Sequence, residues 1–296
     1  MVFKASPCPS RWEGILVTVW LLIFDGLMLL WAMRRPVDWL KFAFVFAVVL
    51  TIPLLVHWIY RTWIAFSLEY WVDRNAVTLH WANVRQVLPL HEIKQIVRAG
   101  VPDLGGTSWI YWPAPHVRPG RGLGLTDVRM AASHKLDDCL VLETGRANIA
   151  LSPADRTGFV DAMQARFAMG PAQIVQPTAV RESLLERIGR RYRPGLILLG
   201  IGLLGVLVLV GLLMVNFPNL PDALALQYNS DGIPVVIRNK SALFILPIIG
   251  FIAWVVNGIG GFVMLGREQP TGAYMLWGGT LVVQICSLLA LVSILP

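Results

Sequence analysis

Charged residues are scarce in this chain of 296 residues: Asp, Glu, Lys and Arg make up 15% of it, whereas 56% of the residues are hydrophobic. Ordinary soluble domains carry about 25% charged and about 45–50% apolar residues. The shortage of charge therefore excludes an ordinary soluble protein. The length alone would suggest about two soluble domains, but this composition indicates membrane spans and one inserted domain.

Cysteine is also scarce. Cys8, Cys139 and Cys286 are odd in number, lie far apart and do not have the spacing of metal ligands. We therefore expect three free thiols.

The net charge of +7 is unevenly distributed along the chain. Between Ala65 and Val180 there are 11 Lys/Arg and 10 Asp/Glu, so this segment is almost neutral and the basic excess lies beside the apolar runs. Nucleic-acid binding needs a basic face on a soluble domain. The distribution thus argues against a nucleic-acid partner and is typical of the charges that set membrane topology.

Five apolar runs are long enough to cross a bilayer, whose core of about 30 Å needs about 20 helical residues. They are Ile15–Met33, Phe42–Tyr60, Gly195–Phe217, Leu243–Leu265 and Ala273–Leu295. The first is too long for a cleavable signal peptide, so we expect it to be a membrane span. Aromatic residues that favour the membrane interface fall near the ends of the runs, namely Trp12, Trp31, Trp39, Trp58, Trp63 and Tyr192.

Basic residues beside the spans predict the orientation, because cytoplasmic flanks are enriched in Lys and Arg. With the N-terminus and the inserted domain in the cytoplasm, the inner flanks hold Lys4, Arg11, Arg61, Arg74, Arg181, Arg187, Arg190, Arg191, Arg193 and Arg267. The outer flanks hold only Arg34, Arg35, Lys41, Arg238 and Lys240. The interface cluster Arg187, Arg190, Arg191 and Arg193 contributes most to this difference, whereas the turn at Arg34–Lys41 opposes it. We expect a multi-pass protein of the cell (inner or plasma) membrane with a cytoplasmic inserted domain.

Four polar residues fall inside the predicted spans: Asp25, His57, Asn257 and Gln284. Ionisable residues in a membrane often mark a proton or ion pathway, so Asp25 and His57 are candidates for a relay. The alternative is hydrogen bonding between helices. Transporters usually have more spans, paired midplane charges and broken helices in repeated halves. Because the sequence lacks these features, we favour the structural role.

The segment from Phe66 to about Gly170 changes to short alternating runs, which are typical of strands. Seven strands are predicted: Ser67–Val72, Ala76–Trp81, Val84–Leu90, Ser108–Trp112, Leu125–Ala131, Cys139–Glu143 and Asn148–Leu151. A helix follows, with Ser152 as its cap, Pro153 at the first position and Asp155 at the third. Its helical spacing predicts a buried stripe of Phe159, Ala162, Met163 and Phe167.

Seven strands closed by one amphipathic helix is the plan of a pleckstrin-homology (PH) barrel. The chain resembles bacterial PH-domain families at Tyr70-Trp71-Val72-Asp73, at Leu88-Pro89-Leu90-His91-Glu92-Ile93 and at Leu151-Ser152-Pro153-Ala154-Asp155. The resemblance implies a barrel that binds a lipid headgroup or a peptide, or that acts as an assembly module. Phosphoinositide-binding members use several basic residues around the first hairpin. Here that turn has only Arg74, so phosphoinositide binding is not expected.

Two motifs suggest chemistry that their context excludes. His91-Glu92-Ile93-Lys94-Gln95 begins like a zinc-protease helix but has Gln95 where the second His ligand is required. Gly120-Arg121-Gly122-Leu123-Gly124 lacks the lysine of a phosphate-binding loop. No nucleophile–base pair or metal-ligand cluster can be assembled, so we expect no enzymatic activity, cofactor or metal.

The aromatic group Trp109, Tyr111 and Trp112 is either part of a core or ligand platform, or a loop resting on lipid headgroups.

The loop at 218–241, between the third and fourth spans, resembles a membrane family of unknown function with the motif LPxxIPxHWNxxGxPD. That family includes immunity proteins against a secreted toxin. The candidate recognition residues are Pro221, Asp222, Tyr228, Asn229, Asp231, Gly232 and Pro234. Ala225 and Gln227 replace the family's Pro and His, so histidine chemistry is not expected. The alternative is a rigid turn, because Asn, Asp and Gly are typical turn residues.

The sequence thus predicts an α+β membrane protein with a PH-like barrel inserted between the second and third spans. Its parts are a transmembrane hairpin (1–64), the PH-like domain (65–172), a basic amphipathic linker (173–194) and a three-span membrane domain (195–296). The favoured function is a non-catalytic membrane scaffold or signalling component. Its cytoplasmic domain would dock a protein partner or a second copy, beside the lipid bilayer. The alternative is an immunity or envelope-stress protein that recognises an extracellular peptide through loop 218–241, and a transporter is least favoured.

Overall fold

The computed structural model describes residues 1–105, 108–122, 125–145, 147–170, 172–173, 192–228 and 234–295. Contacts divide the chain into two units. The first is Met1–Ile23 with Ile52–Leu185, and the second is Phe24–Thr51 with Glu186–Pro296. The predicted domain boundaries remain a prediction, and the predicted linker lies almost wholly outside the described residues.

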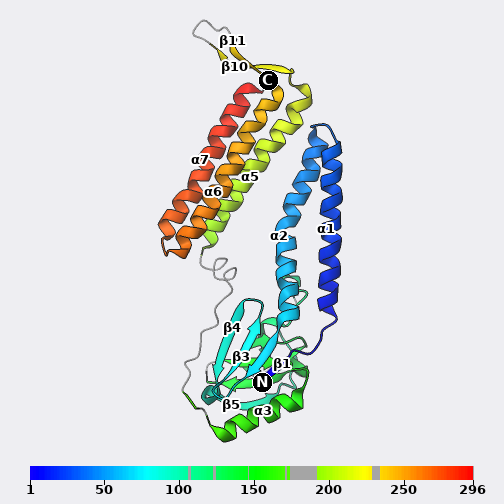
Figure 1. Ribbon diagram of the computed structural model, residues 1–296, viewed down its shortest axis with the longest axis vertical. Coiled ribbons are helices and arrows are strands. Elements are labelled where there is room, and N and C mark those ends of the chain that lie inside the picture. The colour runs from blue at the N-terminus through cyan, green and yellow to red at the C-terminus, as the bar shows by residue number, and fades with distance from the viewer. Residues whose placement is uncertain are drawn as a thin grey trace. The chain divides into compact units, whose positions relative to one another are not determined.

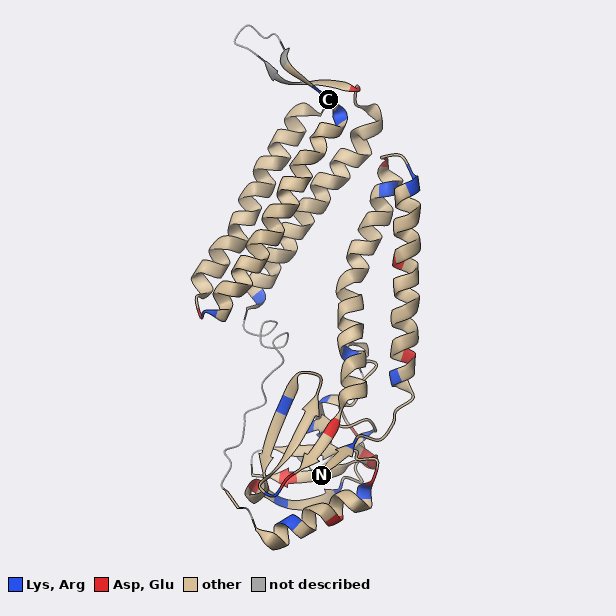
Figure 2. Ribbon diagram, viewed as in Figure 1, with Lys and Arg blue, Asp and Glu red and all other residues tan. Residues whose placement is uncertain are grey.

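Among the described residues, five helices are long and apolar enough to cross a membrane, as predicted. They are α1 (Ser10–Arg34), α2 (Trp39–Ser67), α5 (Arg193–Asn216), α6 (Ile245–Gly266) and α7 (Pro270–Ile294) (Figure 1). Figure 2 shows that their charged residues gather mostly towards the helix ends. Two helices extend past the predicted runs, because α1 begins before Arg11 and α2 continues after Arg61. Both arginines therefore lie on helices rather than in flanking turns.

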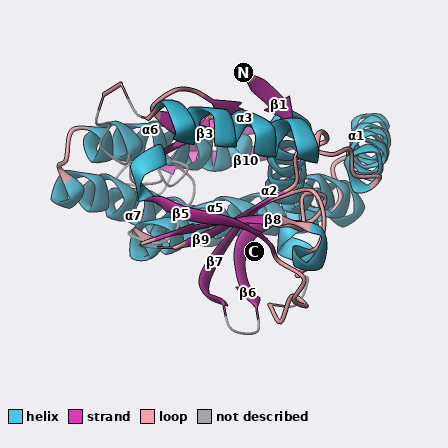
Figure 3. Cartoon of the chain, turned by 90° about the horizontal axis from the view of Figure 1, so that it is seen from below, coloured by secondary structure: helices cyan, strands magenta, loops and turns pink. Residues whose placement is uncertain are grey.

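Two sheets and the helix α3 form the β-rich domain of the first unit. The first sheet has the antiparallel order β1 (Val2–Lys4), β2 (Glu69–Val72), β3 (Ala76–Trp81) and β4 (Val84–Pro89). The second has the order β5 (Ile93–Arg98), β8 (Leu140–Thr144), β9 (Asn148–Leu151), β7 (Leu125–Ala131) and β6 (Val117–Gly122). The β7–β9 pair is parallel and the other pairs are antiparallel. Figure 3 shows this second sheet with the β6–β7 hairpin projecting from it.

Helix α3 (Arg156–Met169) follows β9 and packs on the main core of the domain. Phe159 and Met163 are fully buried there with Tyr70 and Leu79. Phe3, from the strand before α1, packs its ring edge-on against Phe159 with a centroid distance of 5.4 Å. Burial of each such large side chain contributes about 1.5–3 kcal/mol. This core therefore joins the N-terminal strand, the first sheet and α3.

Several predicted details of the domain are wrong. Residues 108–112 form a capped 3-10 turn, η2 (Trp109–Tyr111), rather than a strand, and the strands β1, β5 and β6 were not predicted. The N-cap of α3 is Asp155, which accepts a hydrogen bond from Gly158 N at 2.9 Å, rather than Ser152. Ser152 instead accepts from Ser133 N inside the domain. Phe167, which was predicted to belong to the buried stripe, is 41% exposed near the end of α3.

Helices α5, α6 and α7 pack together in the second unit, with the fully buried indole of Trp277 between them. Trp254 Nε1 on α6 donates to Leu199 O on α5 at 2.8 Å. The connection between α5 and α6 contains an antiparallel hairpin of β10 (Ala223–Tyr228) and β11 (Pro234–Asn239), flanked by η4 (Phe217–Asn219) and η5 (Lys240–Phe244). The predicted outer loop is therefore a folded element.

Candidate functional sites

The residues before α1 belong to the β-rich domain. The strand β1 pairs with β2, and the N-terminal amino group of Met1 donates to Val72 O at 2.9 Å. Beyond the strand, Ser6 N donates to Ser152 O at 2.8 Å, and Ala154 N donates to Lys4 O at 3.0 Å. The segment that enters α1 and the segment that leaves α2 are therefore fixed in one sheet.

Arg61 holds a loop of the domain against α2. The loop comprises residues 108–117 and is called the clamped loop below. The buried Arg61 side chain, 6% exposed, donates to Tyr111 O from Nη2 at 2.6 Å and from Nε at 3.1 Å. It also donates to Ala114 O and to Val117 O, and its guanidinium lies 5.4 Å from the centre of the Tyr111 ring. One cation thus orders three carbonyl groups of the clamped loop.

Pro113, in the middle of the clamped loop, lies near the start of α1 and near the last two turns of α2. Its carbonyl accepts from Ser10 Oγ of α1 at 2.9 Å. A Cβ atom at Gly14 of α1 would lie 2.5 Å from Pro113 Cγ and 2.7 Å from Thr62 Oγ1 of α2. The two helices and the proline therefore meet at a point where only glycine fits.

The upper part of the clamped loop reaches further along α2. His57 Nε2 lies 2.7 Å from Ile110 O, and the Trp58 and Trp112 rings pack edge-to-face with centroids 5.8 Å apart. Trp109 and Ile110 remain exposed, at 67% and 49%. The predicted aromatic group is thereby divided, because Tyr111 and Trp112 contact residues of α2 whereas Trp109 stays largely exposed.

A buried polar group stabilises the interior of the domain. Tyr70 Oη donates to Ala131 O at 2.7 Å and accepts from Ser152 N at 3.2 Å, and burial raises the pKa of the Tyr70 phenol. Cys139 is buried with its thiol directed at Lys135 O, and burial raises its pKa to about 12. Burial, and then the nearby Arg118, lower the pKa of His116. Burial thus favours the neutral form of each of these three side chains.

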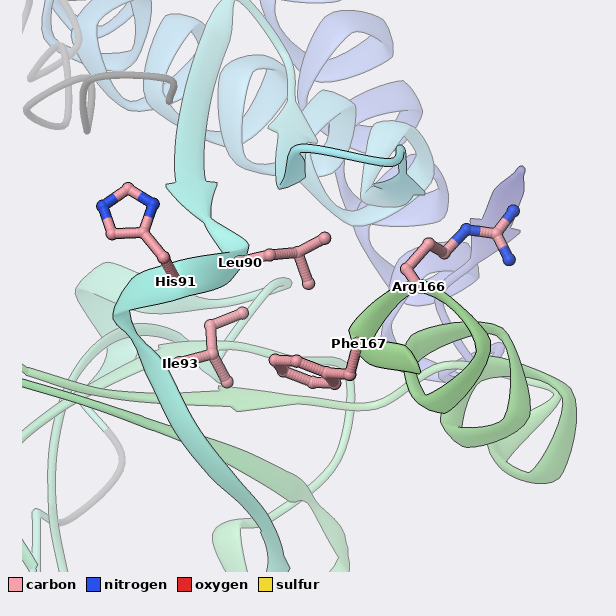
Figure 4. Close-up of a pocket in the computed structure, with 5 residues that line it drawn as sticks. All are labelled: Leu90, His91, Ile93, Arg166 and Phe167. Carbon is pink, nitrogen blue, oxygen red and sulfur yellow. The ribbon is translucent and has the colours of Figure 1, made fainter. Parts of the chain in front are cut away.

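An apolar recess of about 250 Å³ opens between the end of α3 and the start of β5. Figure 4 shows Leu90, Ile93 and Phe167 directed toward one another, while His91 and Arg166 point outward on opposite sides. A second shallow recess of about 300 Å³ is lined by Arg98, Leu140, Arg156, Thr157, Val160 and Asp161. The first recess combines a partly exposed aromatic floor with cationic and imidazole groups at its rim.

The structure places the predicted intramembrane polar residues in hydrogen bonds to other elements. The Thr51 hydroxyl of α2 lies 2.8 Å from Asp25 Oδ1 of α1, and His57 contacts the clamped loop. In the second unit, Asn257 Nδ2 lies 3.2 Å from Thr280 Oγ1, and Gln284 Nε2 donates to Gly250 O at 2.9 Å. The contacts of Asp25, Asn257 and Gln284 fit the role of bonding between helices, whereas His57 contacts a loop instead.

The described part of loop 218–241 is held together at its base by contacts of one lysine. Lys240 Nζ forms an ion pair with Asp222 at 3.0 Å, donates to Leu220 O at 3.2 Å and lies 5.1 Å from the centre of the Phe217 ring. Pro221 adjoins this base, Tyr228 is the last residue of β10, and Pro234 is the first residue of β11. Asn229, Asp231 and Gly232 lie outside the described residues, as do Arg187, Arg190 and Arg191. Arg193 is the first residue of α5.

Sequence reasoning missed Arg61 and Lys240 as organising residues, because it counted both only as topology charges. One signal was available for Arg61: a basic residue inside an apolar run, followed by more helix-forming apolar residues, suggests a buried partner.

Within the described part of the chain, no group of three His, Cys, Asp or Glu side chains is placed to hold a metal ion. Comparisons with protein-family models, with characterised proteins and with solved structures find no match to this chain.

Proposed function

We propose that this chain is a non-catalytic integral membrane scaffold or signalling component, whose PH-like domain lies in the cytoplasm and docks a protein partner. The observation that carries the proposal is the attachment of the domain to α1 and α2. Strand β1 fixes the start of α1, and Arg61 fixes the clamped loop to α2. A domain held at both helices presents its surfaces in one orientation to the bilayer, which reduces the ordering cost of binding a partner.

The arrangement of strands supports a PH-like domain. A sheet formed by β2, β3 and β4 is followed by a second sheet and then by α3, whose Phe159 and Met163 enter the core. The parallel β7–β9 pair is a departure from a simple antiparallel meander. The proposal therefore concerns a PH-like plan with its own strand order.

The recess at the end of α3 is the docking site that we propose for the partner. Its floor of Leu90, Ile93 and Phe167 suits an apolar side chain, and Arg166 and His91 at its rim suit an acidic neighbour of that side chain. The partner expected is thus a peptide segment with one apolar anchor and a flanking carboxylate. Short motifs of this kind bind through a central apolar contact with charged groups at the rim.

Photocrosslinking in intact cells tests this docking site. A benzophenone amino acid at Phe167 of the full chain is expected to give one discrete adduct, whereas the same probe at the exposed Asp137 gives none of that mass. Arg166→Glu should weaken the adduct about fivefold, since losing one rim charge pair costs about 1 kcal/mol. Met169→Glu, on the same helix but outside the recess, is the matched control and should leave the adduct unchanged. Equal adducts at residues 167 and 137, or no effect of Arg166→Glu, would contradict the proposed site.

Cysteine reporters test the proposed orientation. With Cys8 and Cys286 replaced, Asp137→Cys in the soluble domain and Arg238→Cys on β11 each add one exposed thiol. In intact cells, a membrane-impermeant maleimide should label Arg238→Cys within minutes and should label Asp137→Cys only after the membrane is opened. The reverse pattern would place the soluble domain outside and remove the cytoplasmic docking role.

The second candidate function is recognition of an extracellular peptide, and a specific feature of the hairpin favours it. Ile237 on β11 is 61% exposed beside Arg238, while the base of the hairpin is fastened by the Asp222–Lys240 ion pair. An exposed apolar residue on a fixed hairpin suits β-strand addition or a small apolar contact. If Ile237→Asp abolished survival against an envelope toxin while Arg166→Glu did not, this function would replace the first.

A further inference from the structure

The tip of the clamped loop lies beside a part of α2 that is well inside the apolar helix. Ile110 O contacts His57, whereas Tyr111 O contacts Arg61, which lies about 6 Å further along the axis at 1.5 Å per residue. The loop therefore runs along α2 from Arg61 to the level of His57. Helix residues at this level expose large apolar side chains, including Val56 at 53% and Ile59 at 48%.

The exposed side chains of the tip are themselves apolar. Trp109 is 67% exposed and Ile110 is 49% exposed, while the neighbouring Trp112 packs on Trp58. An indole carries about 150–250 Å² of surface, which is costly to leave in water but favourable at the lipid headgroup level, where Trp is enriched. The carbonyl of Ile110 contacts His57, and Tyr111 and Trp112, which follow directly, contact Arg61 and Trp58, so the tip is held against α2.

The backbone of the tip has the hydrogen bonds that a lipid environment requires. Polar backbone groups must be satisfied within the protein where water is excluded. Tyr111 N donates to Ser108 O at 3.0 Å, and Trp112 N donates to Trp109 O at 3.1 Å. The carbonyls of Ile110 and Tyr111 face His57 and Arg61. The carbonyl of Tyr111 thus meets a buried guanidinium, and that of Ile110 meets a half-buried imidazole.

We propose that Trp109 and Ile110 enter the interfacial layer of the same bilayer that α1 and α2 cross, so that the soluble domain is a third point of membrane contact. This inference rests on the proposed membrane insertion of the helices. The occupant of the exposed Trp109–Ile110 surface is thus phospholipid at the boundary between headgroups and acyl chains. Insertion would fix the distance of the domain from the membrane and would make the clamped loop sensitive to lipid composition.

Fluorescence quenching in vesicles tests the inference. The full chain, with Cys8 and Cys286 replaced, is reconstituted into vesicles of phosphatidylcholine and phosphatidylglycerol, and a bimane label is attached to Trp109→Cys. Cys139 is buried and stays unlabelled in the folded protein. A nitroxide on the lipid near the glycerol is expected to quench this label at least threefold more than a label at Asp137→Cys. Aqueous iodide should show the opposite order.

A label at Ile59→Cys on α2 separates failure of this inference from failure of the membrane proposal. If the lipid nitroxide quenches the Ile59 label but not the Trp109 label, the helices span the bilayer and the inserted tip is wrong. If neither label is quenched by lipid, membrane insertion itself is wrong. If iodide is blocked from the Trp109 label without lipid quenching, a protein surface covers the tip and the lipid contact is overturned.

Discussion

Replacing Arg61 by Met is expected to lower the melting temperature of the full chain in detergent by about 10 °C. The substitution keeps the length and most of the apolar volume of the side chain but removes the guanidinium group that donates to Tyr111 O, Ala114 O and Val117 O. Hydrogen bonds to a charged group contribute about 1.5–3 kcal/mol each, and acceptors left buried without a donor add a further cost. Because the hydrogen bonds to these three carbonyls share one guanidinium group and are coupled, we expect a loss of about 3–5 kcal/mol rather than their sum. A loss of this size corresponds to about 10 °C for a chain of this length.

The destabilisation caused by Arg61→Met should be concentrated in the clamped loop. Hydrogen exchange should accelerate in residues 108–117 by at least about tenfold in the Arg61→Met variant, since the loop loses its main contacts to α2. Arg61→Lys keeps the charge but has no planar fork and should recover less than half of the loss. Arg74→Met, at an exposed turn of the same domain, is the matched control and should change the melting temperature by less than about 2 °C. Equal melting temperatures for Arg61→Met and Arg74→Met would show that the clamp contributes nothing to the stability of the domain.

The helices were predictable because each depends on a local property of the sequence. A long apolar run with few charges usually forms a membrane-spanning helix, so the positions of α5, α6 and α7 were predicted to within a few residues. The ends were less predictable, because Arg11 and Arg61 were taken as the limits of the runs. An arginine can continue a helix where its side chain finds protein carbonyls, and Arg61 does so at the clamped loop.

The sheets were only partly predictable, because their pairing is not local. Strand β1 is three residues long and pairs with β2 across the whole of α1 and α2, so no local pattern marks it. The edge strand β6 contains Pro119 and two glycines, which suggest a loop. In the opposite sense, the aromatic residues at 108–112 suggest a strand, but Ser108 accepts from Ile110 N and closes a short turn.

The candidate sites were even less accessible from the sequence. The recess at the end of α3 depends on Phe167 being left partly exposed where a helical stripe predicted burial. The hairpin β10–β11 was interpreted as a possible rigid turn because its central residues are turn formers, although its flanks pair as antiparallel strands, with register shifts after Ala225 and after Gln227. The sequence analysis singled out Phe167 and the segment of the hairpin in both cases. Their structural roles were not predictable, because they depend on contacts with residues that lie elsewhere in the sequence.

The second large expected effect on stability concerns the packing site of Trp277 in the α5–α7 bundle. Its indole is fully buried, with Gly195 of α5 on one side and Gly261 of α6 on the other. A Cβ atom at Gly261 would lie 2.1 Å from Trp277 Nε1, and one at Gly195 would lie 2.0 Å from Trp277 Cζ3. Close packing of this kind is the main source of helix association in a bilayer, where apolar burial alone gives little drive.

Gly261→Ala is therefore expected to destabilise the α5–α7 bundle by about 3 kcal/mol, because the added methyl group must displace a rigid ring from a filled site. Thermal unfolding in detergent followed by size-exclusion chromatography measures the effect. Gly278→Ala is the matched control: its Cβ would meet no atom within 4 Å, and it should be neutral or slightly stabilising, since alanine favours a helix. Combining Gly261→Ala with Trp277→Leu should cost less than the two single changes together, by at least about 1 kcal/mol, because the smaller side chain makes room for the methyl group. Strict additivity of the two substitutions would mean that the glycine and the indole do not share one site, and that α6 is held to α5 and α7 by other contacts.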